Sequence, residues 1–435
     1  MQDELITVER TLKENLIYNI HDVDSLLQLG EIYNSSGRQQ LAKLCFSKIL
    51  NISNDIYVRE KTRALLFKSE HDIQTNPNKV QAAPVFLDLL IKELLDHSVN
   101  DYYYNIDIGL YEELTSIPIS NDLSVVNTEN EKKEILNYLQ GIIELFDHLE
   151  DQSSRDLLLT ILAFRILGNK KVKLPLNTNE YWAQRQSLQN LIDGNETMKT
   201  KFHGWNLPLF NLGTVGYDLQ LFCISVGLSA TFMDRQYEYE KIAPVIKASE
   251  ADVVIDAGGC FGDTALYFAH EVGENGHVYT VEFIPSNLEI MTKNLDLNEK
   301  LKQRITIVER PLWDVSNELL YYMDQGPASS VSFTKSDYFN EETLTISIDD
   351  LVKEKNIPKI DFIKMDIECA ELNALKGAMQ TIQTFRPKLA IAIYHQIKDF
   401  ANVVSFIAAL NLGYKFYLGH YTMHAQETIL FAVPQ

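Results

Sequence analysis

The residues best suited to chemistry lie in the second half of the chain, where charged and glycine residues directly follow short apolar runs. One apolar run ends at Asp256 and passes into a turn that contains Gly258 and Gly262. Glycine lets the backbone approach a bound molecule closely, and free amides at the start of the next helix favour an anionic group. The spacing differs from the G-x-G-x-x-G fingerprint of nicotinamide-binding proteins, because Cys260 stands where the second glycine is required, and no G-x-x-x-x-G-K-[ST] sequence occurs.

A carboxylate follows the next apolar run. Glu282 ends a strand expected to lie beside the glycine turn, where a carboxylate can accept both hydroxyls of a ribose. The turn and the carboxylate together suit a nucleoside that carries an anionic group, without the signature of a pyrophosphate. S-adenosylmethionine meets that description, because it combines adenosine, a carboxylate and a sulfonium cation that an acidic site would stabilise.

Two further groups at strand ends could act on a methyl acceptor. Asp366 and His395 each end a later strand, and neighbouring strands lie about 5 Å apart, so both groups could face one site. An alcohol is a poor nucleophile until a base removes its proton. We expect His395 to be that base, as a neutral imidazole near pH 7, and Asp366 to be its partner or an anchor for sugar hydroxyls. Glu368 and Glu371 open a helix, where carboxylates can simply stabilise the amino end.

A metal ion is a second use for the same side chains. Asp366, Glu368 and His395 could share a divalent cation, because carboxylate oxygens and imidazole nitrogens are common ligands. Spacing in sequence does not bring three ligands within reach of one ion, so the metal stays undecided. His420 and His424 lie between the last two expected strands and could reach either the acceptor or water.

The elements that position these residues alternate regularly. We expect strands over 253–256, 277–281, 305–308, 361–366, 388–394, 414–418 and 428–433, helices over 264–271, 286–294, 370–382 and 399–410, and a hairpin of 329–333 with 344–348. Such alternation predicts an α/β fold with a mainly parallel, doubly wound, Rossmann-like sheet, whose ligands lie beyond the carboxyl ends of the strands. The last two strands are too close in sequence for a parallel crossover, so one of them is expected to be antiparallel.

The first part of the chain reads as helices. We expect a helical region over 1–170, a connecting region over 171–239 and the α/β domain over 240–435, with further helices over 84–97, 129–148 and 153–167 and a loop over 98–128. A tetratricopeptide-like hairpin is expected near 22–54, from the spacing of Leu26, Leu29, Gly30, Tyr33, Ala42 and Phe46. A single copy cannot form a solenoid, so the hairpin should pack against another part of the chain.

Residues 251–433 resemble the FkbM family of S-adenosylmethionine-dependent methyltransferases, which have the class I methyltransferase fold. The stretches that carry the resemblance are 254–264 (VIDAGGCFGDT), 281–287 (VEFIPSN), 346–351 (ISIDDL) and 361–371 (DFIKMDIECAE). The sequence departs from the family pattern at Gly259 and Cys260, which replace alanine and asparagine, and at Cys369, which replaces a glycine. A β-carbon at position 369 predicts a local change of the backbone.

The resemblance implies which residues contact the cofactor and what is methylated. It implies that the cofactor pocket is lined by Asp256, Gly258, Gly262, Asp263, Thr264 and Glu282. It also implies that Leu312 and Trp313 approach the adenine, although Trp313 suits a place in the core equally well. The expected activity is O-methylation of a hydroxyl group, with a sugar or glycan of a surface polysaccharide, or a precursor of a secondary metabolite, as the acceptor.

Composition excludes several other classes. Sixty Asp and Glu against 39 Lys and Arg give a formal charge of −21, which disfavours nucleic acid as a partner. No apolar run is long enough to span a membrane, and four dispersed cysteines predict a reduced, cytoplasmic protein. Two rival functions stay open, a nicotinamide-dependent oxidoreductase and a non-catalytic scaffold that binds partners through its helical region. That region could also form a homo-oligomer.

Overall fold

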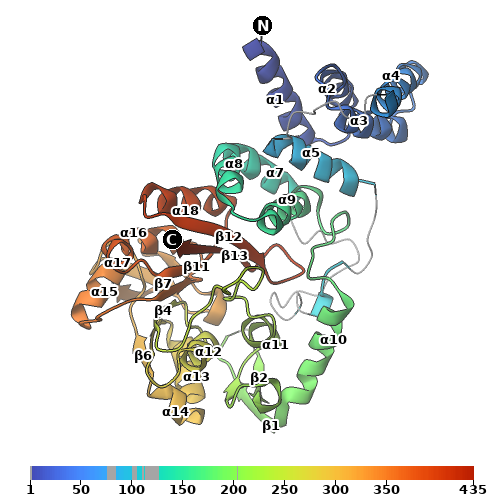
Figure 1. Cartoon of the computed structure of the whole chain (residues 1–435). Coiled ribbons are helices and arrows are strands. Elements are labelled where there is room, and N and C mark those ends of the chain that lie inside the picture. Colours follow the sequence, from blue (N-terminus) through green and yellow to red (C-terminus); the bar gives the residue numbers. More distant parts are fainter. Residues whose placement is uncertain (1, 76–84, 100–104, 110–111, 113–126, 203) are drawn as a thin grey trace.

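The computed structural model describes residues 2–75, 85–99, 105–109, 112, 127–202 and 204–435. Most of the loop expected over 98–128, and the expected first residue of the helix over 84–97, lie outside these residues. The chain begins with a helical region, continues through a small sheet and ends in a large sheet covered by helices (Figure 1). None of the described helices is both long and apolar enough to cross a lipid bilayer.

The helical region is built from amphipathic helices that pack in antiparallel pairs and layers. Its helices are α1 (Gln2–Tyr18), α2 (Val23–Ser35), α3 (Gln39–Ile52), α4 (Ile56–Thr75), α5 (Phe86–His97), α7 (Thr128–Asn137), α8 (Leu139–His148) and α9 (Gln152–Leu167). Helices α2 and α3 form a hairpin in the region expected to be tetratricopeptide-like. A β-carbon on Gly30 would lie 2.5 Å from the ring of Phe46, so glycine is what permits the close approach of the two helices.

The large sheet has seven strands in the order β12-β13-β11-β10-β4-β5-β6. The strands are β4 (Val253–Ala257), β5 (His277–Val281), β6 (Ile305–Val308), β10 (Phe362–Met365), β11 (Lys388–Ala392), β12 (Tyr414–His420) and β13 (Thr428–Pro434). The five strands from β6 to β11 are parallel, and β13 is antiparallel to both of its neighbours. This order confirms the predicted fold, a mainly parallel, doubly wound Rossmann-like sheet with an antiparallel C-terminal strand.

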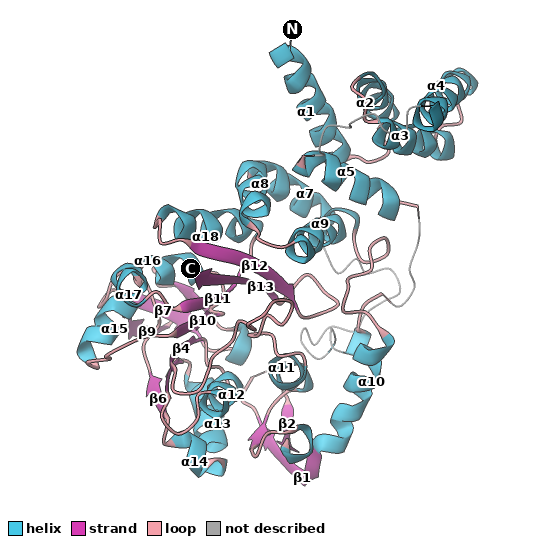
Figure 2. Ribbon diagram, viewed as in Figure 1, coloured by secondary structure: helices cyan, strands magenta, loops and turns pink. Residues whose placement is uncertain are grey.

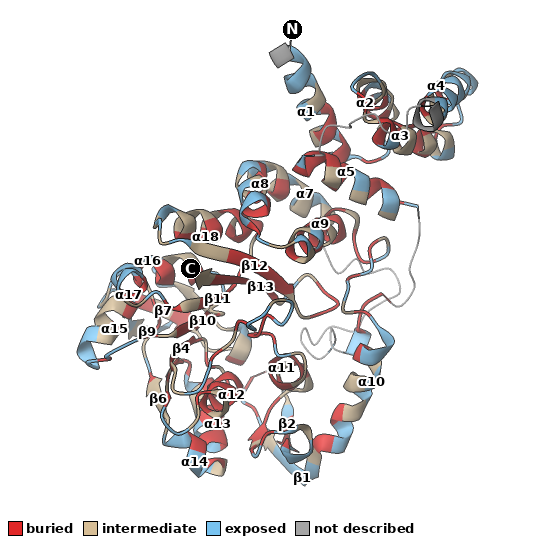
Figure 3. Ribbon diagram, viewed as in Figure 1, coloured by how far each residue is buried: buried red, intermediate tan, exposed pale blue. Residues whose placement is uncertain are grey.

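Helices cover both faces of this sheet (Figure 2). They are α12 (Asp263–Glu271), α13 (Pro285–Leu297), α14 (Glu299–Lys302), α15 (Ile348–Glu354), α16 (Glu371–Lys376), α17 (Met379–Phe385) and α18 (Ile397–Ala409). Successive strand residues face opposite sides, so Ile255 and Ile363 belong to one hydrophobic core while Val254 and Phe362 belong to the other. The central strands are buried, whereas α1 and α4 expose much of their surface (Figure 3).

A small antiparallel sheet corrects one expectation. Strands β7 (Leu319–Met323), β8 (Ser330–Ser332) and β9 (Glu341–Leu344) pair in the order β8-β7-β9, with η4 (Gly326–Ala328) between β7 and β8. The hairpin expected between 329–333 and 344–348 is wrong, because β8 and β9 both pair with the intervening strand β7 rather than with each other. The unpredicted strand β7 provides the pairing partner for both.

The connecting region forms a second small sheet. It contains α10 (Asn179–Ser187), η1 (Leu188–Leu191), β1 (Ile192–Lys199), β2 (Asn206–Asn211), η2 (Gly213–Val215), β3 (Gln220–Phe222), α11 (Ser225–Leu228) and the π-helical turn η3 (Ser229–Met233). The three strands are antiparallel in the order β1-β2-β3. Asn294 of α13 fixes β3 against the large sheet's helices, accepting from the Phe222 amide at 2.7 Å and donating to the Phe222 carbonyl at 2.9 Å.

The helical region packs directly on the large sheet. A β-carbon on Gly141 of α8 would lie 2.4 Å from the β-carbon of Ala401 on α18, and Leu149 forms a parallel bridge with Phe416 of β12. Arg165 of α9 reaches further, donating to the carbonyls of Tyr394 at 3.0 Å and Ala425 at 2.7 Å. One continuous hydrophobic core joins both parts, so the helical region supports the carboxyl edge of the sheet.

Candidate active site

Asp256 lies beneath the glycine turn, surrounded by protein donors. Its side chain has no solvent exposure and accepts hydrogen bonds from the hydroxyls of Thr264, at 2.9 and 3.0 Å, and Thr280, at 2.9 Å. The ammonium of Lys364, on the neighbouring strand β10, lies 3.2 Å from Oδ1 of Asp256. These contacts make Asp256 and Thr264 buried supports of the turn, and their expected contact with the cofactor stays a prediction.

The glycines of the turn are required by neighbouring backbone. Gly258 has φ +86°, and a β-carbon there would lie 1.9 Å from the carbonyl oxygen of Asp366. Gly262 has φ +84°, and its β-carbon would lie 3.0 Å from the side chain of Met291. Gly258 therefore allows the end of β4 to approach the end of β10, which brings the two sequence motifs together.

Glu282 borders the turn on its other side. The amides of Gly258 and Gly259 donate to the carbonyl of Val281, at 3.1 and 3.0 Å, so the turn rests against the end of β5. The carboxylate of Glu282 has 6% exposure and accepts from the amides of Phe283, at 2.6 Å, and Ile284, at 2.8 Å, through Oε1. Burial raises the pKa of Glu282 to about 7, against the lowering effect of these amides, of Asn287 and of the Cys260 amide. Burial thus makes protonation of Glu282 sensitive to pH near neutrality.

The remaining expected cofactor residues are Asp263, Leu312 and Trp313. Asp263 accepts from the hydroxyl of Thr231 at 2.9 Å, which ties α12 to η3, and burial raises the pKa of the Asp263 carboxyl. Leu312 is 4% exposed within the hydrophobic core. Trp313 is half-buried and makes an edge contact with Phe333, with ring centroids 4.9 Å apart.

Asp366 is the centre of a second group of side chains beyond the ends of β10 and β11. It accepts hydrogen bonds from the hydroxyls of Tyr237, at 3.2 Å, and Tyr394, at 3.1 Å. Nε2 of His395 lies 3.4 Å from Oδ1 of Asp366. The structure thus brings together the two residues that the sequence assigned to catalysis, and adds two tyrosine hydroxyls.

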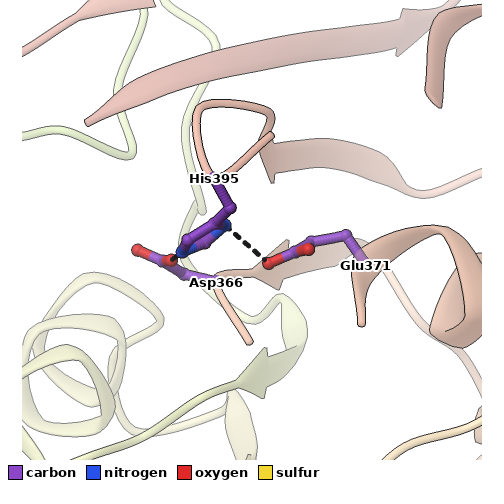
Figure 4. A group of neighbouring side chains, drawn as sticks. All are labelled: Asp366, Glu371 and His395. Carbon is purple, nitrogen blue, oxygen red and sulfur yellow. Dashed lines mark ion pairs between the residues drawn. The ribbon is translucent and has the colours of Figure 1, made fainter. Parts of the chain in front are cut away.

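Carboxylates surround the ring of His395, as Figure 4 shows for Asp366 and Glu371 on opposite sides. Nδ1 lies 3.2 Å from Oε1 of Glu371, and Nε2 lies 3.5 Å from Oε2 of Glu368. These distances are those of ion pairs, but neither ring nitrogen has a hydrogen bond of good geometry. Burial opposes a charge on His395, yet Glu368, Glu371 and Asp366 outweigh it and raise the pKa of the ring to about 12. The surrounding carboxylates therefore favour the imidazolium form of His395, whereas the sequence led us to expect a neutral base there.

Glu371 fixes this arrangement from the start of α16. Its side chain is 1% exposed, and Oε1 accepts the amide of Ile367 at 2.8 Å, while Oε2 is buried without a hydrogen bond among the described residues. Asp366, Glu371 and His395 each offer a ligand atom, and these atoms lie within 4.8 Å of one another. Glu371 thus takes the place that the sequence gave to Glu368 in the candidate metal cluster.

Glu427 is a further acidic residue at this site that the sequence did not indicate. Burial and the charge of Asp366 raise the pKa of Glu427 to about 8, while His395 acts in the opposite direction. Glu427 also adopts a left-handed backbone with φ +58°, as do Glu368 at +53°, Cys369 at +76° and Cys260 at +44°. Non-glycine residues adopt this conformation at a cost of about 1–2 kcal/mol each, and such residues concentrate at functional sites. At Cys369 the backbone keeps the conformation that glycine would favour.

The two C-terminal histidines belong to the protein interior. Nδ1 of His420 lies 2.9 Å from the hydroxyl of Thr428, and burial lowers the pKa of His420 to about 3. His424 is 2% exposed, and burial lowers its pKa to about 4, against the charge and backbone of Asp107. Both rings therefore favour the neutral form, and the charge of Arg165 adds to this effect at His420 as that of Arg185 does at His424.

Residues 256–416 match the family model of the Methyltransferase FkbM domain. No curated protein matches the sequence significantly. Among solved structures, the chain is similar to the methyltransferase FkbM from Methylobacillus flagellatus, with 18% sequence identity and a TM-score of 0.44 over 69% of this chain. The chain spans 60% of the length of that protein.

Two smaller structures are similar to about half of the chain. The fibrillarin from Aeropyrum pernix, solved with S-adenosylmethionine, has 12% identity and a TM-score of 0.32, covering 55% of this chain and 99% of its own. The O-methyltransferase from Bacillus cereus, solved with S-adenosylhomocysteine (SAH), has 13% identity and a TM-score of 0.29, covering 47% of this chain and 78% of its own.

Proposed function

Because residues 256–416 are a methyltransferase FkbM domain, we propose that this protein transfers a methyl group from S-adenosylmethionine to a hydroxyl group of a sugar or glycan. The observation that carries the proposal is the position of the turn at Gly258–Cys260 between two acidic groups. Glu282 borders the turn through the Cys260 amide, and the backbone of Asp366 lies against Gly258. One ligand of nucleoside size could therefore contact Glu282 at one end and the Asp366 cluster at the other.

Glu282 is the residue that we propose for the ribose. Each oxygen of a carboxylate can accept two hydrogen bonds. Oε2 of Glu282 accepts one from the side chain of Asn287, at 3.0 Å. Gly258 and Cys260 of the turn are half-buried, and the Cys260 amide donates to the Glu282 carboxylate. These groups fit a ribose and the adjoining methionine part of the cofactor.

When bound, S-adenosylmethionine supplies a methyl group made electrophilic by a sulfonium. The protein's part is to hold the acceptor oxygen in line with that methyl group and to take its proton. We propose that Asp366 takes the proton of the acceptor hydroxyl. Its carboxylate accepts hydrogen bonds from two tyrosine hydroxyls, so it lies where the hydroxyl of the acceptor could also donate. We assign His395 and Glu371 the role of holding that carboxylate in position. In the reaction the new carbon–oxygen bond forms as the carbon–sulfur bond breaks, and the hydroxyl proton goes to Asp366.

The acidity of the site also favours the cofactor's charge. Asp366, Glu368, Glu371 and Glu427 contribute carboxyl groups, whereas His395 is the cation among them. A sulfonium would lower the repulsion among these carboxylates. Glu368, with a side chain 58% exposed, is the member that an acceptor from solvent would reach first. A carboxylate there accepts hydrogen bonds from the hydroxyls of a sugar.

A divalent cation at the same cluster is the second candidate. Asp366, Glu371 and His395 supply carboxylate oxygens and an imidazole nitrogen, which suit Mn²⁺, Fe²⁺ or Zn²⁺. The ion would take the place of a ring proton and would orient the acceptor oxygen. Methyl transfer by protein dialysed against a chelator, with and without each metal restored, decides between the two arrangements.

The test of function is methyl transfer from labelled S-adenosylmethionine to a panel of nucleotide sugars and short oligosaccharides. We expect label in one class of sugar, and a loss of at least 100-fold in rate for Asp366→Asn with S-adenosylmethionine affinity preserved. Calorimetry with S-adenosylmethionine and with NADH separates this function from the nicotinamide oxidoreductase. Binding of neither cofactor at millimolar concentration would favour a scaffold and refute the proposal.

A further inference from the structure

The two carboxylate oxygens of Asp366 have different surroundings. The hydroxyl of Tyr394, at 3.1 Å, and Nε2 of His395, at 3.4 Å, both approach Oδ1. Among the residues that the structure describes, only Tyr237 donates a hydrogen bond to Oδ2, at 3.2 Å. Each oxygen of a carboxylate can accept two hydrogen bonds. Oδ2 is therefore the oxygen with room for one more hydroxyl.

The side chain of Tyr237 is held firmly in place. Tyr237 belongs to the segment between η3 and β4, is 2% exposed, and its ring packs against that of Phe268 in α12, with centroids 5.9 Å apart. The ammonium of Lys364 lies 5.3 Å from the centre of the same ring, which is the distance of a cation–π interaction. A ring enclosed in this way has little room to rotate, so its hydroxyl keeps a fixed position.

Gln236 fixes the direction in which the Tyr237 hydroxyl donates. Gln236 is 4% exposed, and its Nε2 donates to the hydroxyl oxygen of Tyr237. An ionised carboxylate can only accept hydrogen bonds, so the Tyr237 hydroxyl accepts from Gln236 and donates to Asp366. Hydrogen bonds in such a chain polarise and strengthen one another. Gln236 thus directs the proton of Tyr237 toward Oδ2.

The side chain of Asp366 needs this support more than its backbone does. The Asp366 amide donates to the carbonyl of Ala257 at 3.1 Å, and the Asp366 carbonyl lies against Gly258, where a β-carbon would be 1.9 Å away. These contacts fix the backbone against the end of β4. The Asp366 side chain is 16% exposed, so the position of Oδ2 depends on the hydrogen bond from Tyr237.

We propose that Tyr237 is a positioning residue for methyl transfer, and that its hydroxyl holds Oδ2 of Asp366 toward the acceptor hydroxyl. This inference rests on the proposed function. As the carbon–oxygen bond forms and the carbon–sulfur bond breaks, the acceptor proton passes to Oδ2 of Asp366, and Tyr237 keeps its own proton. A displaced base slows the chemical step more than it weakens binding. Tyr237 precedes the residues that match the FkbM family model, so the segment before the match contributes to the reaction.

The experiment removes the hydroxyl and keeps the ring. In the full chain, Tyr237→Phe should lower kcat about tenfold or more, while the KM of the acceptor and the calorimetric affinity for S-adenosylmethionine change by less than about twofold. Tyr239→Phe is the matched control, because Tyr239 is 1% exposed and donates to Asp151 at 2.6 Å. This control should keep kcat unchanged. An unchanged kcat in Tyr237→Phe, or an equal fall in both variants, would overturn the inference.

A second comparison tests whether Tyr237 acts through Asp366. In an Asp366→Asn background, adding Tyr237→Phe should cause no further loss of kcat, and a loss that multiplies with the first would count against the inference. If Tyr237→Phe unfolds by circular dichroism, Gln236→Leu replaces it. That variant frees the Tyr237 hydroxyl and should lower kcat about threefold or more, again with Tyr239→Phe as control.

The outcomes separate this inference from the proposed function. If the natural protein transfers no methyl group to any acceptor, the proposed function is refuted, and the role of Tyr237 with it. If the natural protein is active and neither Tyr237→Phe nor Gln236→Leu lowers kcat, only the role of Tyr237 is refuted.

Discussion

Lys364 and Asp256 face each other across the neighbouring strands β10 and β4, with Nζ 3.2 Å from Oδ1 and with side chains 1% and 0% exposed. The same ammonium donates to the carbonyls of Ala257 at 3.0 Å and Gly258 at 2.6 Å. One buried cation therefore neutralises the acid at the base of the turn and fixes the turn's backbone. This relationship stabilises the backbone on which the candidate site is built.

Replacing Lys364 should destabilise the protein strongly. Lys364→Met leaves Asp256 buried without its counter-charge, a change that costs about 3–5 kcal/mol. The free energy of unfolding from urea titration measures it. Lys359→Met is the control, because Lys359 pairs with Asp361 at 2.7 Å with a side chain 47% exposed, and such a pair contributes about 0–1 kcal/mol. Similar losses of unfolding free energy in both variants would show that the buried pair stabilises the protein no more than the exposed pair does.

Gly258→Ala should be more harmful than an alanine at another left-handed glycine. The new β-carbon would meet the Asp366 carbonyl and must also adopt φ near +86°, so we expect a loss of about 3 kcal/mol and weaker S-adenosylmethionine binding. Gly216, with φ +102° and no atom within 4 Å of an added β-carbon, isolates the conformational cost of about 1–2 kcal/mol. Chemical denaturation and calorimetry compare the two variants. Equal losses would contradict the close approach of β4 and β10.

Cofactor affinity should fall as the pH decreases through 7. Burial raises the pKa of Glu282 to about 7, so the carboxylate that accepts the ribose hydroxyls in our proposal becomes protonated below that pH. A single proton weakens binding by up to about tenfold per pH unit. Titration calorimetry at pH 6 and pH 8 measures the difference for the natural protein and for Glu282→Gln. Glu427→Gln, at another buried acid with a raised pKa, should keep the pH dependence. If cofactor affinity still depends on pH in Glu282→Gln, a group other than Glu282 causes the dependence.

His424 should make the fold sensitive to mild acid. Its pKa is lowered from 6.5 to about 4 by burial, so between those values the unfolded chain binds a proton that the folded protein does not. Stability is therefore lost as the pH falls from 6.5 towards 4, by up to about 3 kcal/mol, and is fully present above 6.5. Urea unfolding at pH 7 and pH 5 should show a smaller difference for His424→Phe than for the control His148→Gln, at an exposed position. The same slope in all proteins would exclude His424 as its cause.

Much of the fold follows from local patterns in the sequence. Buried strands alternate with helices at regular intervals, and the short connection between β12 and β13 requires an antiparallel pair. Strand β7 escaped prediction, because its sequence of leucines and tyrosines has no clear alternation, and the hairpin expected across it was wrong in consequence. Pairing partners of short strands depend on tertiary contacts that a local pattern does not contain.

The residues of the candidate site also fall into those that the sequence could indicate and those that it could not. The rule that ligands lie beyond strand ends identified Glu282, Asp366 and His395. Lys364 had a usable signal, since a lysine between apolar residues of a buried strand requires a buried partner. Tyr237 had none, because it reaches Asp366 from 129 positions away. Which side chains surround an acid at a strand end, as Thr264, Thr280 and Lys364 surround Asp256, depends on packing that spacing does not reveal.

The guanidinium of Arg165, which comes from α9, holds the backbone at Tyr394 and Ala425 and also pairs with Glu131 of α7 at 3.0 Å. The scaffold of the candidate active site thus includes residues that precede the match to the FkbM family model by about ninety positions. A fragment that begins at the domain boundary would lack Arg165, and with it the hydrogen bonds that hold the backbone on the acceptor side of the site. Exchanging the amino-terminal half between homologues would likewise require α7, α9 and the carboxyl edge of the sheet to be transplanted as one piece.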